Sequence, residues 1–426
     1  MLMSRSRAAL KRPLLAGFVA LALVLLTIGA LSSRRPAAAA TGSLVAVSSF
    51  GSNPGALQMY TYTPANLPAN APLVVAMHGC TQTANDYFTH SGWPELADTY
   101  KFAVVFPQQP TANNSTNCFD WWTPSDDGRG VGEAASVKSM VDYEKSHLSI
   151  DSARVFLTGL SAGGAMTADL LADYPDVFAG GATDSGLPAQ CATTQTQATN
   201  CQQNNQNLTP AQWAAKVKAA YSGYSGPYPR VAIWQGTADY VVYPVNGTEL
   251  RDQWTAVHGL SQTPSSTQPL TGGTTETTYN DASGVSQVAF FSISGMGHGT
   301  AVHPGTGVDN CGSTGAYFLD YICSSYYTAQ FWGLTGGGTP TPTPTTSSPT
   351  PTPTTSSPSP TPTPTPTYAC VTASNYDHTV AGRAYQSGGY TYANGSNQNM
   401  GLWNTYVTHT LRQTGPNYWV IADGQC

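Results

Sequence analysis

Between about residues 41 and 334, short apolar runs alternate with longer stretches of helical character. The apolar runs are rich in β-branched and aromatic residues and lie at 72–77, 102–106, 154–159, 178–183, 230–236 and 287–293. Helices are expected at 131–147, 162–173, 210–221 and 246–258. Because these strands are continuously apolar rather than alternating, both faces of their sheet should be buried. The pattern therefore predicts an α/β domain, a mostly parallel sheet covered by helices on both faces.

The N-terminus carries a different apolar segment. Residues 14–31 are continuously apolar, follow a basic stretch, and precede "RRPAAAA", which ends in small residues. This order is typical of a secretory signal peptide, here residues 1–40, cleaved after Ala40. The run of 18 residues also approaches the length of a membrane span, so an uncleaved anchor stays open as the alternative. With cleavage, the protein is expected to be secreted and extracellular, without membrane contact.

A low-complexity segment at 335–367 separates the catalytic region, 41–334, from a C-terminal module at 368–426. From Thr339 to Thr367 every residue is Thr, Pro or Ser, which predicts an extended spacer with a reach of about 90 Å. The module is framed by Cys370 and Cys426 and holds nine aromatic residues. The core of so small a module needs fewer than nine aromatic side chains. Some of them should therefore be exposed and form a contact surface for an insoluble polymer.

Cysteine usage and charge narrow the class of protein. The eight cysteines follow the predicted signal peptide, and none lies in a C-x-x-C pair, which favours disulfides over zinc. Pairing of sequence neighbours would join 80 with 118, 191 with 201, 311 with 323 and 370 with 426, although other connectivities remain open. Residues 1–40 hold six of the 17 Lys and Arg and none of the 23 Asp and Glu, so the remainder carries a net charge of −12. Binding to nucleic acid is not expected.

The segment "TGLSAGGAM" contains a G-x-S-x-G pattern centred on Ser161. Glycine is common in this chain, so the pattern alone is weak. Its context is stronger, because "RVFLT" predicts a strand and "AMTADLLADY" predicts a helix. A strand, a sharp glycine-rich turn and a helix are the setting of a nucleophile elbow, and Ser161 is therefore the predicted catalytic nucleophile.

A nucleophilic serine needs a base and an acid that orients the base. In such sheets the chain order is Ser, then Asp or Glu, then His. Asp239 follows the strand "RVAIW", and His298 follows "QVAFFSI" within "GMGHG", so both are predicted to lie in loops at strand ends. His303 and Asp309 remain the alternatives for the base and the acid.

The oxyanion needs two backbone donors. The predicted donors are the N–H of Ala162, which follows the nucleophile, and the N–H of Cys80, in the loop after the strand "PLVVAM". A disulfide from Cys80 to Cys118 would bring Trp121 or Trp122 to the rim of the site, and Trp122 is the candidate for substrate binding. Neither a metal-ligand pattern nor a phosphate-binding glycine motif is present, so no metal and no cofactor are expected.

Several motifs, in this order, resemble the secreted poly(3-hydroxybutyrate) depolymerase family of serine esterases, whose relatives include feruloyl and acetylxylan esterases. They are "MHGCTQTANDY", "GWPELADTYKFAVVFPQQ", "NCFDWW", "GRGVGEAASV", "VFLTGLSAGGAMT" and "GMGHG". The resemblance implies an α/β-hydrolase fold, with the catalytic roles on Ser161, Asp239 and His298 and an oxyanion donor at Cys80. Residues 368–426 resemble the C-terminal substrate-binding domain of polyester depolymerases.

The sequence thus predicts a monomeric, secreted serine esterase that hydrolyses poly(3-hydroxybutyrate) or a similar short-chain polyester. Release of ferulate or acetate from plant xylan is the alternative, because an aromatic tail could also hold a carbohydrate. A non-catalytic adhesion protein on a hydrolase scaffold is a third possibility, and the loss of a triad residue would be its signature.

Overall fold

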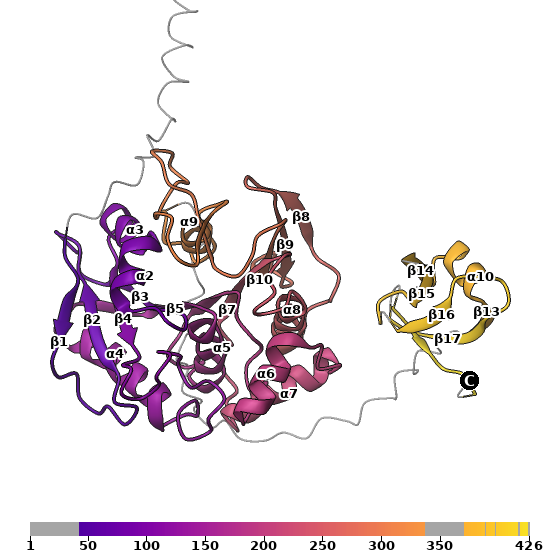
Figure 1. Cartoon of the computed structure of the whole chain (residues 1–426), viewed down its shortest axis with the longest axis horizontal. Coiled ribbons are helices and arrows are strands. Elements are labelled where there is room, and N and C mark those ends of the chain that lie inside the picture. The colour runs from indigo at the N-terminus through magenta and orange to yellow at the C-terminus, as the bar shows by residue number, and fades with distance from the viewer. Residues whose placement is uncertain (1–41, 337–369, 388, 397, 416–417, 425–426) are drawn as a thin grey trace, which may run out of the picture. The chain divides into compact units, whose positions relative to one another are not determined.

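The computed structural model describes residues 42–336, 370–387, 389–396, 398–415 and 418–424. These residues fall into two units, one on each side of the Thr/Pro/Ser-rich segment (Figure 1). The predicted signal peptide and spacer lie outside the described residues. Among the residues that are described, no helix has the length and apolar character needed to cross a membrane.

The larger unit is built on a ten-stranded sheet with the order β1-β2-β4-β3-β5-β6-β7-β10-β9-β8. The six central strands, from β4 to β10, are mutually parallel, and the strands at both edges are antiparallel. In chain order the strands are Val45–Val47, Gln58–Tyr62, Ala71–Met77, Ala103–Gln108, Ile150–Leu160, Gly180–Asp184, Arg230–Gly236, Ser266–Pro269, Thr274–Asn280 and Ser286–Ile293.

Helices cover both faces of this sheet (Figure 1). Successive residues of a strand point to opposite faces, and in β3 Val75 packs with one apolar core while Val74 packs with the other. The first core contains residues of α4 (Gly132–His147), α5 (Ala162–Asp173), α7 (Pro210–Ala220) and α8 (Val245–Val257). The second contains residues of α2 (Ala84–His90), α3 (Trp93–Tyr100) and α9 (Ser324–Phe331). The predicted layered architecture is confirmed.

Every strand and helix predicted from the apolar pattern is present, with ends shifted by at most a few residues. The elements that were not predicted are short or polar. They include the antiparallel strands β1, β2, β8 and β9, the helices α2, α3 and α9, the helix α6 (Gln195–Gln203), and a separate parallel pair, β11 (Thr300–Val302) with β12 (Phe318–Asp320).

The C-terminal unit is a small two-sheet module. Its strands β13 (Cys370–Ser374), β17 (Thr408–Gly415) and β18 (Tyr418–Ile421) form one sheet, and β14 (Ala384–Ser387), β15 (Tyr390–Ala393) and β16 (Asn399–Leu402) form the other, with α10 (Asn375–Val380) beside them. Its buried apolar core comprises Ala384, Ala393, Met400, Leu411 and Trp419. Among the described residues of this unit, one aromatic side chain, that of Trp419, belongs to this core, and several of the others are exposed.

Three of the neighbour disulfides expected from the sequence are formed. They join Cys80 to Cys118, Cys191 to Cys201, and Cys311 to Cys323. Cys370 is also disulfide-bonded, whereas Cys426, its expected partner, lies outside the described residues.

Candidate active site

Ser161 occupies the sharp turn between β5 and α5. Its backbone has φ 57° and ψ −118°. Residues other than glycine rarely adopt this conformation, which costs about 1–3 kcal/mol. The neighbouring glycines make this turn possible. A Cβ on Gly159 would collide with the carbonyl of Gly163, and a Cβ on Gly163 would lie 2.7 Å from the carbonyl oxygen of Met77. The glycines therefore let the end of β5, the start of α5 and the end of β3 meet.

His298 and Asp239 lie together at the carboxyl ends of β10 and β7. His298 Nδ1 and Asp239 Oδ2 are 2.9 Å apart, and the two side chains are almost completely buried. Because Nδ1 faces a carboxylate, it carries the ring proton and donates a hydrogen bond to Asp239, which leaves Nε2 as the nitrogen with a free lone pair. This is the tautomer that a general base acting on a serine requires.

Asp239 is held by its own loop. Its Oδ1 accepts hydrogen bonds from the N–H groups of Val241 and Val242, both at 2.9 Å. These two bonds leave Oδ2 directed at His298. The carboxylate is therefore fixed in orientation before any substrate arrives.

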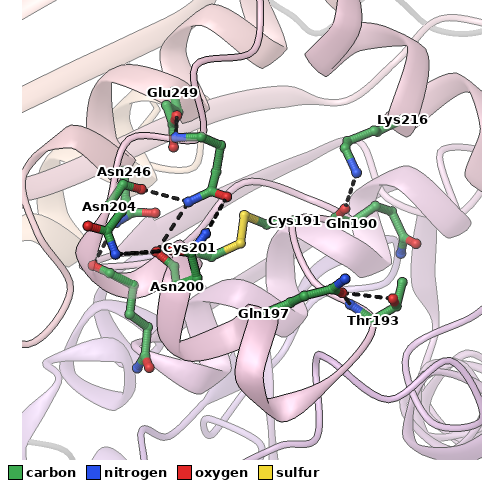
Figure 2. Close-up of a disulfide and its surroundings, with 12 residues drawn as sticks. Gln190, Cys191, Thr193, Gln197, Asn200, Cys201, Asn204, Lys216, Asn246 and Glu249 are labelled. Atoms are coloured by element: carbon green, nitrogen blue, oxygen red, sulfur yellow. Dashed lines mark hydrogen bonds between the residues drawn. A yellow bond between two sulfur atoms is a disulfide. The ribbon is translucent and has the colours of Figure 1, made fainter.

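The helix α6 supports the loop that follows Asp239. The carbonyl of Gln202, in α6, accepts hydrogen bonds from the Tyr243 N–H at 2.8 Å and from Asn246 Nδ2 at 3.0 Å. Figure 2 shows the disulfide between Cys191 and Cys201, which ties α6 to the segment before it. The disulfide thus restrains the helix against which the acid loop rests.

Hydrogen bonds also join the histidine loop to the serine turn. The Ser161 N–H donates to the Asp184 carbonyl at 2.9 Å, and the Asp184 side chain accepts from Thr300 Oγ1 at 3.0 Å. Burial raises the pKa of Asp184 to about 7. Within the described residues no hydrogen bond joins Ser161 Oγ to His298 Nε2. The structure thus brings both loops to the same edge of the sheet, and the contact between these two side chains stays a prediction.

The predicted oxyanion donors lie on both sides of the β3 and α5 contact. Ala162 is the first residue of α5, so its N–H has no acceptor within the helix. Cys80 lies in the loop after β3, where its disulfide to Cys118 and the hydrogen bond from the Thr81 N–H to the Thr116 carbonyl fix the chain. The loop is therefore anchored to the neighbouring segment, as expected for a donor that must not move.

His78 precedes this loop and is a structural residue. Its Nε2 accepts from the Gln109 N–H at 3.1 Å, and its Nδ1 therefore donates to the Gly79 carbonyl at 2.8 Å. Complete burial lowers the pKa of the His78 ring to about 4. The imidazole is neutral at ordinary pH and shapes the oxyanion loop.

The two tryptophans predicted near the rim differ in exposure. Trp121 is buried, whereas Trp122 is partly buried and packs at the edge of the first core. Their rings make an edge contact with centroids 5.5 Å apart. Of the two side chains, only that of Trp122 is therefore accessible to a substrate, and its role in substrate binding stays a prediction.

The alternative acid and base have other partners. His303 Nδ1, just after β11, lies 2.8 Å from Oδ1 of Asp320, the last residue of β12, and both side chains are exposed. The Asp309 carboxylate accepts from the Tyr327 hydroxyl at 3.4 Å. Across the described part of the chain, no group of three or more His, Cys, Asp or Glu side chains could hold a metal ion.

Two residues near the site were not predicted from the sequence. Tyr317 makes an edge contact with the His298 ring, with centroids 5.9 Å apart. Gln82 is buried and bonds to both the Gly79 N–H and the Ala316 carbonyl. Gln82 belongs to the "HGCTQ" segment and could have been noticed there. Nothing in the sequence marks Tyr317, because its contact with His298, 19 residues earlier, depends on how the largely irregular chain between them folds.

Comparison with known proteins identifies relatives of this arrangement. Residues 56–277 match the profile of the family described as "Esterase PHB depolymerase", where PHB is poly(3-hydroxybutyrate). The chain is 51% identical to poly(3-hydroxyalkanoate) depolymerase C of Paucimonas lemoignei over 295 residues, which are 69% of this chain and 71% of that protein. It is 39% identical to feruloyl esterase B of Talaromyces stipitatus over 280 residues, 64% of this chain and 76% of that one.

Among solved structures, an acetyl xylan esterase from Aspergillus awamori superposes with a TM-score of 0.59 at 30% identity. The match covers 69% of this chain and the whole of that one. The predicted α/β-hydrolase fold is thereby confirmed.

Proposed function

The chain belongs to the PHB depolymerase family of esterases, and on this premise we propose that it hydrolyses poly(3-hydroxybutyrate) or a similar short-chain polyester through an acyl-enzyme on Ser161. The observation that carries the proposal is the 2.9 Å hydrogen bond between His298 and Asp239. This pair of residues lies at the same edge of the sheet as the strained turn that contains Ser161. A carboxylic ester hydrolase of this kind needs no cofactor for the reaction.

In the first half of the reaction, Ser161 Oγ attacks the ester carbonyl carbon and its proton passes to His298 Nε2. The Cys80 and Ala162 N–H groups donate to the oxyanion that forms. The bond to the leaving alcohol then breaks, and the proton on Nε2 moves to the leaving oxygen. In the second half, His298 Nε2 takes a proton from water as the water oxygen attacks the acyl carbon. The bond to Ser161 Oγ then breaks, the acid is released, and the proton on Nε2 returns to Ser161 Oγ.

The C-terminal unit is proposed to hold the insoluble polymer. Its large exposed side chains are mostly aromatic, namely Tyr376, Tyr385, Tyr390, Trp403 and Tyr406. The rings of Tyr376 and Trp403 lie 5.4 Å apart. Flat, uncharged contact area suits a neutral polyester surface. Three disulfides in the larger unit favour an oxidising compartment, which supports secretion.

Release of ferulate or acetate from xylan is the second candidate, favoured by the 39% identity to feruloyl esterase B. Residues 41–426 should be assayed on a poly(3-hydroxybutyrate) film and on feruloylated, acetylated xylan, with Ser161→Ala as the blank for both. Erosion of the film by the wild type alone supports the polyester. An intact film with ferulate or acetate released from xylan rejects it in favour of the second candidate.

A further inference from the structure

Tyr317 stands beside the histidine of the site in an unusual backbone conformation. Its φ is +65°, a left-handed value that is uncommon for a bulky residue and costs free energy. Its side chain nevertheless remains 42% exposed, so burial of the ring does not compensate for the strain. The ring edge faces His298 with an interplanar angle of 76°. Strain at an exposed aromatic beside a reactive group is typical of functional positions.

The chain around Tyr317 is fixed to the histidine loop. Its carbonyl accepts the Thr300 N–H at 2.9 Å. Gly299 passes so close that a Cβ there would lie 2.6 Å from the Tyr317 carbonyl oxygen. The Tyr317 backbone and the His298 loop therefore keep one relative position.

The same chain is fixed to the oxyanion loop through Gln82. Gln82 Nε2 donates to the Ala316 carbonyl at 3.2 Å, and Gln82 Oε1 accepts the Gly79 N–H at 2.8 Å. The side chain is only 4% exposed, so these bonds are shielded from water and hold better than exposed ones. The position of Tyr317 is thus fixed relative to both His298 and the loop of the predicted oxyanion donors.

From this geometry we infer that Tyr317 is a specificity-determining residue that contacts the alcohol part of the ester. The inference rests on the proposed function in taking His298 as the base. His298 Nδ1 is engaged by Asp239, so Nε2 must return the proton to the leaving oxygen. That oxygen therefore lies beside the imidazole, and the group attached to it meets the exposed ring. In the polyester, that group is the next hydroxyacyl unit, which is uncharged and offers methyl and methylene groups to an aromatic surface.

The test uses two esters of one acid, so that both produce the same acyl-enzyme. They are methyl 3-hydroxybutyrate and the dimer whose alcohol is a second 3-hydroxybutyrate unit with its carboxyl group capped as the amide, so that both leaving alcohols are uncharged. For the full chain, Tyr317→Ala should lower kcat/KM about tenfold or more on the dimer and less than about twofold on the methyl ester. Deacylation should be unchanged because the alcohol has already left. Tyr317→Phe keeps the ring and should behave as the wild type.

Equal losses on both esters, or a changed deacylation rate, would overturn the inference, because the ring would then act on His298 rather than on the alcohol. Failure of the proposed function has a different result, in which the wild type cleaves neither 3-hydroxybutyrate ester but cleaves methyl ferulate. The same comparison then applies to ferulate esters of methanol and arabinose. A loss confined to the arabinose ester upholds the role of Tyr317, and equal losses reject it.

Discussion

At the scale of single residues, the site depends on how each oxygen of Asp239 is occupied. Oδ1 is taken by two backbone N–H groups and Oδ2 faces His298 Nδ1. An amide at this position would have to present either its oxygen or its NH₂ group to the imidazole. The two N–H donors favour the amide oxygen at the position that Oδ1 now occupies, which turns the NH₂ group toward His298. The His298 Nδ1 must then accept that hydrogen bond, so the ring proton moves to Nε2.

We therefore expect Asp239→Asn to lower kcat by about 10⁴-fold with little change in KM, because Nε2 becomes protonated and can no longer accept the Ser161 proton. Steady-state hydrolysis of a soluble short-chain ester measures this. Asp309→Asn is the matched control and should keep full activity. If Asp309→Asn lost activity and Asp239→Asn did not, Asp309 rather than Asp239 would be the acid that orients His298.

Asp173, at the end of α5, predicts a pH dependence of stability. Burial, reinforced by the nearby Asp127 carboxylate, raises its pKa to about 8, and its Oδ2 has no hydrogen-bond partner. An unfolded aspartate has a pKa of about 3.9. Between these values the folded protein binds the proton more tightly, so the free energy of unfolding falls as the pH rises from about 4 through 8.

Urea denaturation at pH 5 and at pH 8.5 checks this dependence. Asp173→Asn should reduce the difference in unfolding free energy between the two pH values by about 1–3 kcal/mol. Asp176→Asn is the control, because Asp176 is exposed and its pKa is lowered by the bond to Arg129. It should leave the difference unchanged. An identical pH dependence in wild type and Asp173→Asn would show that another group controls it.

At the scale of elements, the contact between β3 and the start of α5 holds the Ser161 turn against the loop that contains Cys80. A Cβ on Gly163 would overlap the His78 and Met77 carbonyls. Gly163→Ala should therefore separate the two segments, destabilise the protein by about 2 kcal/mol or more, and lower kcat about 10²-fold through misplaced oxyanion donors.

Thermal denaturation and ester hydrolysis measure the two effects of Gly163→Ala. For stability alone, Gly297→Ala is the control, since a Cβ there meets nothing within 4 Å. Gly163→Ala with wild-type stability and activity would contradict the tight contact at the elbow.

The elements that the sequence predicts are those whose burial is complete. β3 is buried along its whole length, β5 is buried from Val155 to Leu160 and β7 from Val231 to Gly236, and these are the stretches that the apolar pattern marks. The strand β9, "TTETTYN", lies next to the edge strand β8 and is only partly buried, and its polar Thr-rich sequence carries no apolar signal. The helices α2 and α3 have only seven and eight residues, too few for a clear period, although the capping box from Thr83 to Asp86 could have been noticed.

The candidate site shows the same limit. Ser161, Asp239 and His298 could be proposed because each follows a strand that the sequence reveals. Gln82 bonds to Ala316, 234 positions further along the chain, and Tyr317 meets His298 only because the largely irregular chain between them folds back. No local pattern encodes such contacts, so only the folded chain reveals these neighbours.

At the scale of the whole molecule, the described residues form two units, and the account assigns chemistry to one and adhesion to the other. A chain ending at Leu334 should hydrolyse a soluble ester at the wild-type rate, because all triad candidates lie in the larger unit. On a poly(3-hydroxybutyrate) film it should lose most of its activity at low enzyme concentration, since the aromatic module no longer raises the local concentration at the surface.

Release of soluble hydroxyacids from the film, over a range of enzyme concentrations, measures the contribution of the module. A full-length variant that combines Trp403→Ala with Tyr406→Ala tests the aromatic surface alone, because the module itself stays attached. Equal film erosion by the full and shortened chains would contradict the adhesive role and leave the catalytic assignment untouched.

The most direct test of the central claim is to trap the acyl-enzyme. Residues 41–426 are mixed with an activated short-chain ester, quenched in acid within the first turnover, digested and mapped by mass spectrometry. The account predicts one acyl group, on Ser161 in the peptide containing "TGLSAGGAM", and none in Ser161→Ala. An acyl group on another residue, or turnover by Ser161→Ala at the wild-type rate, would contradict it.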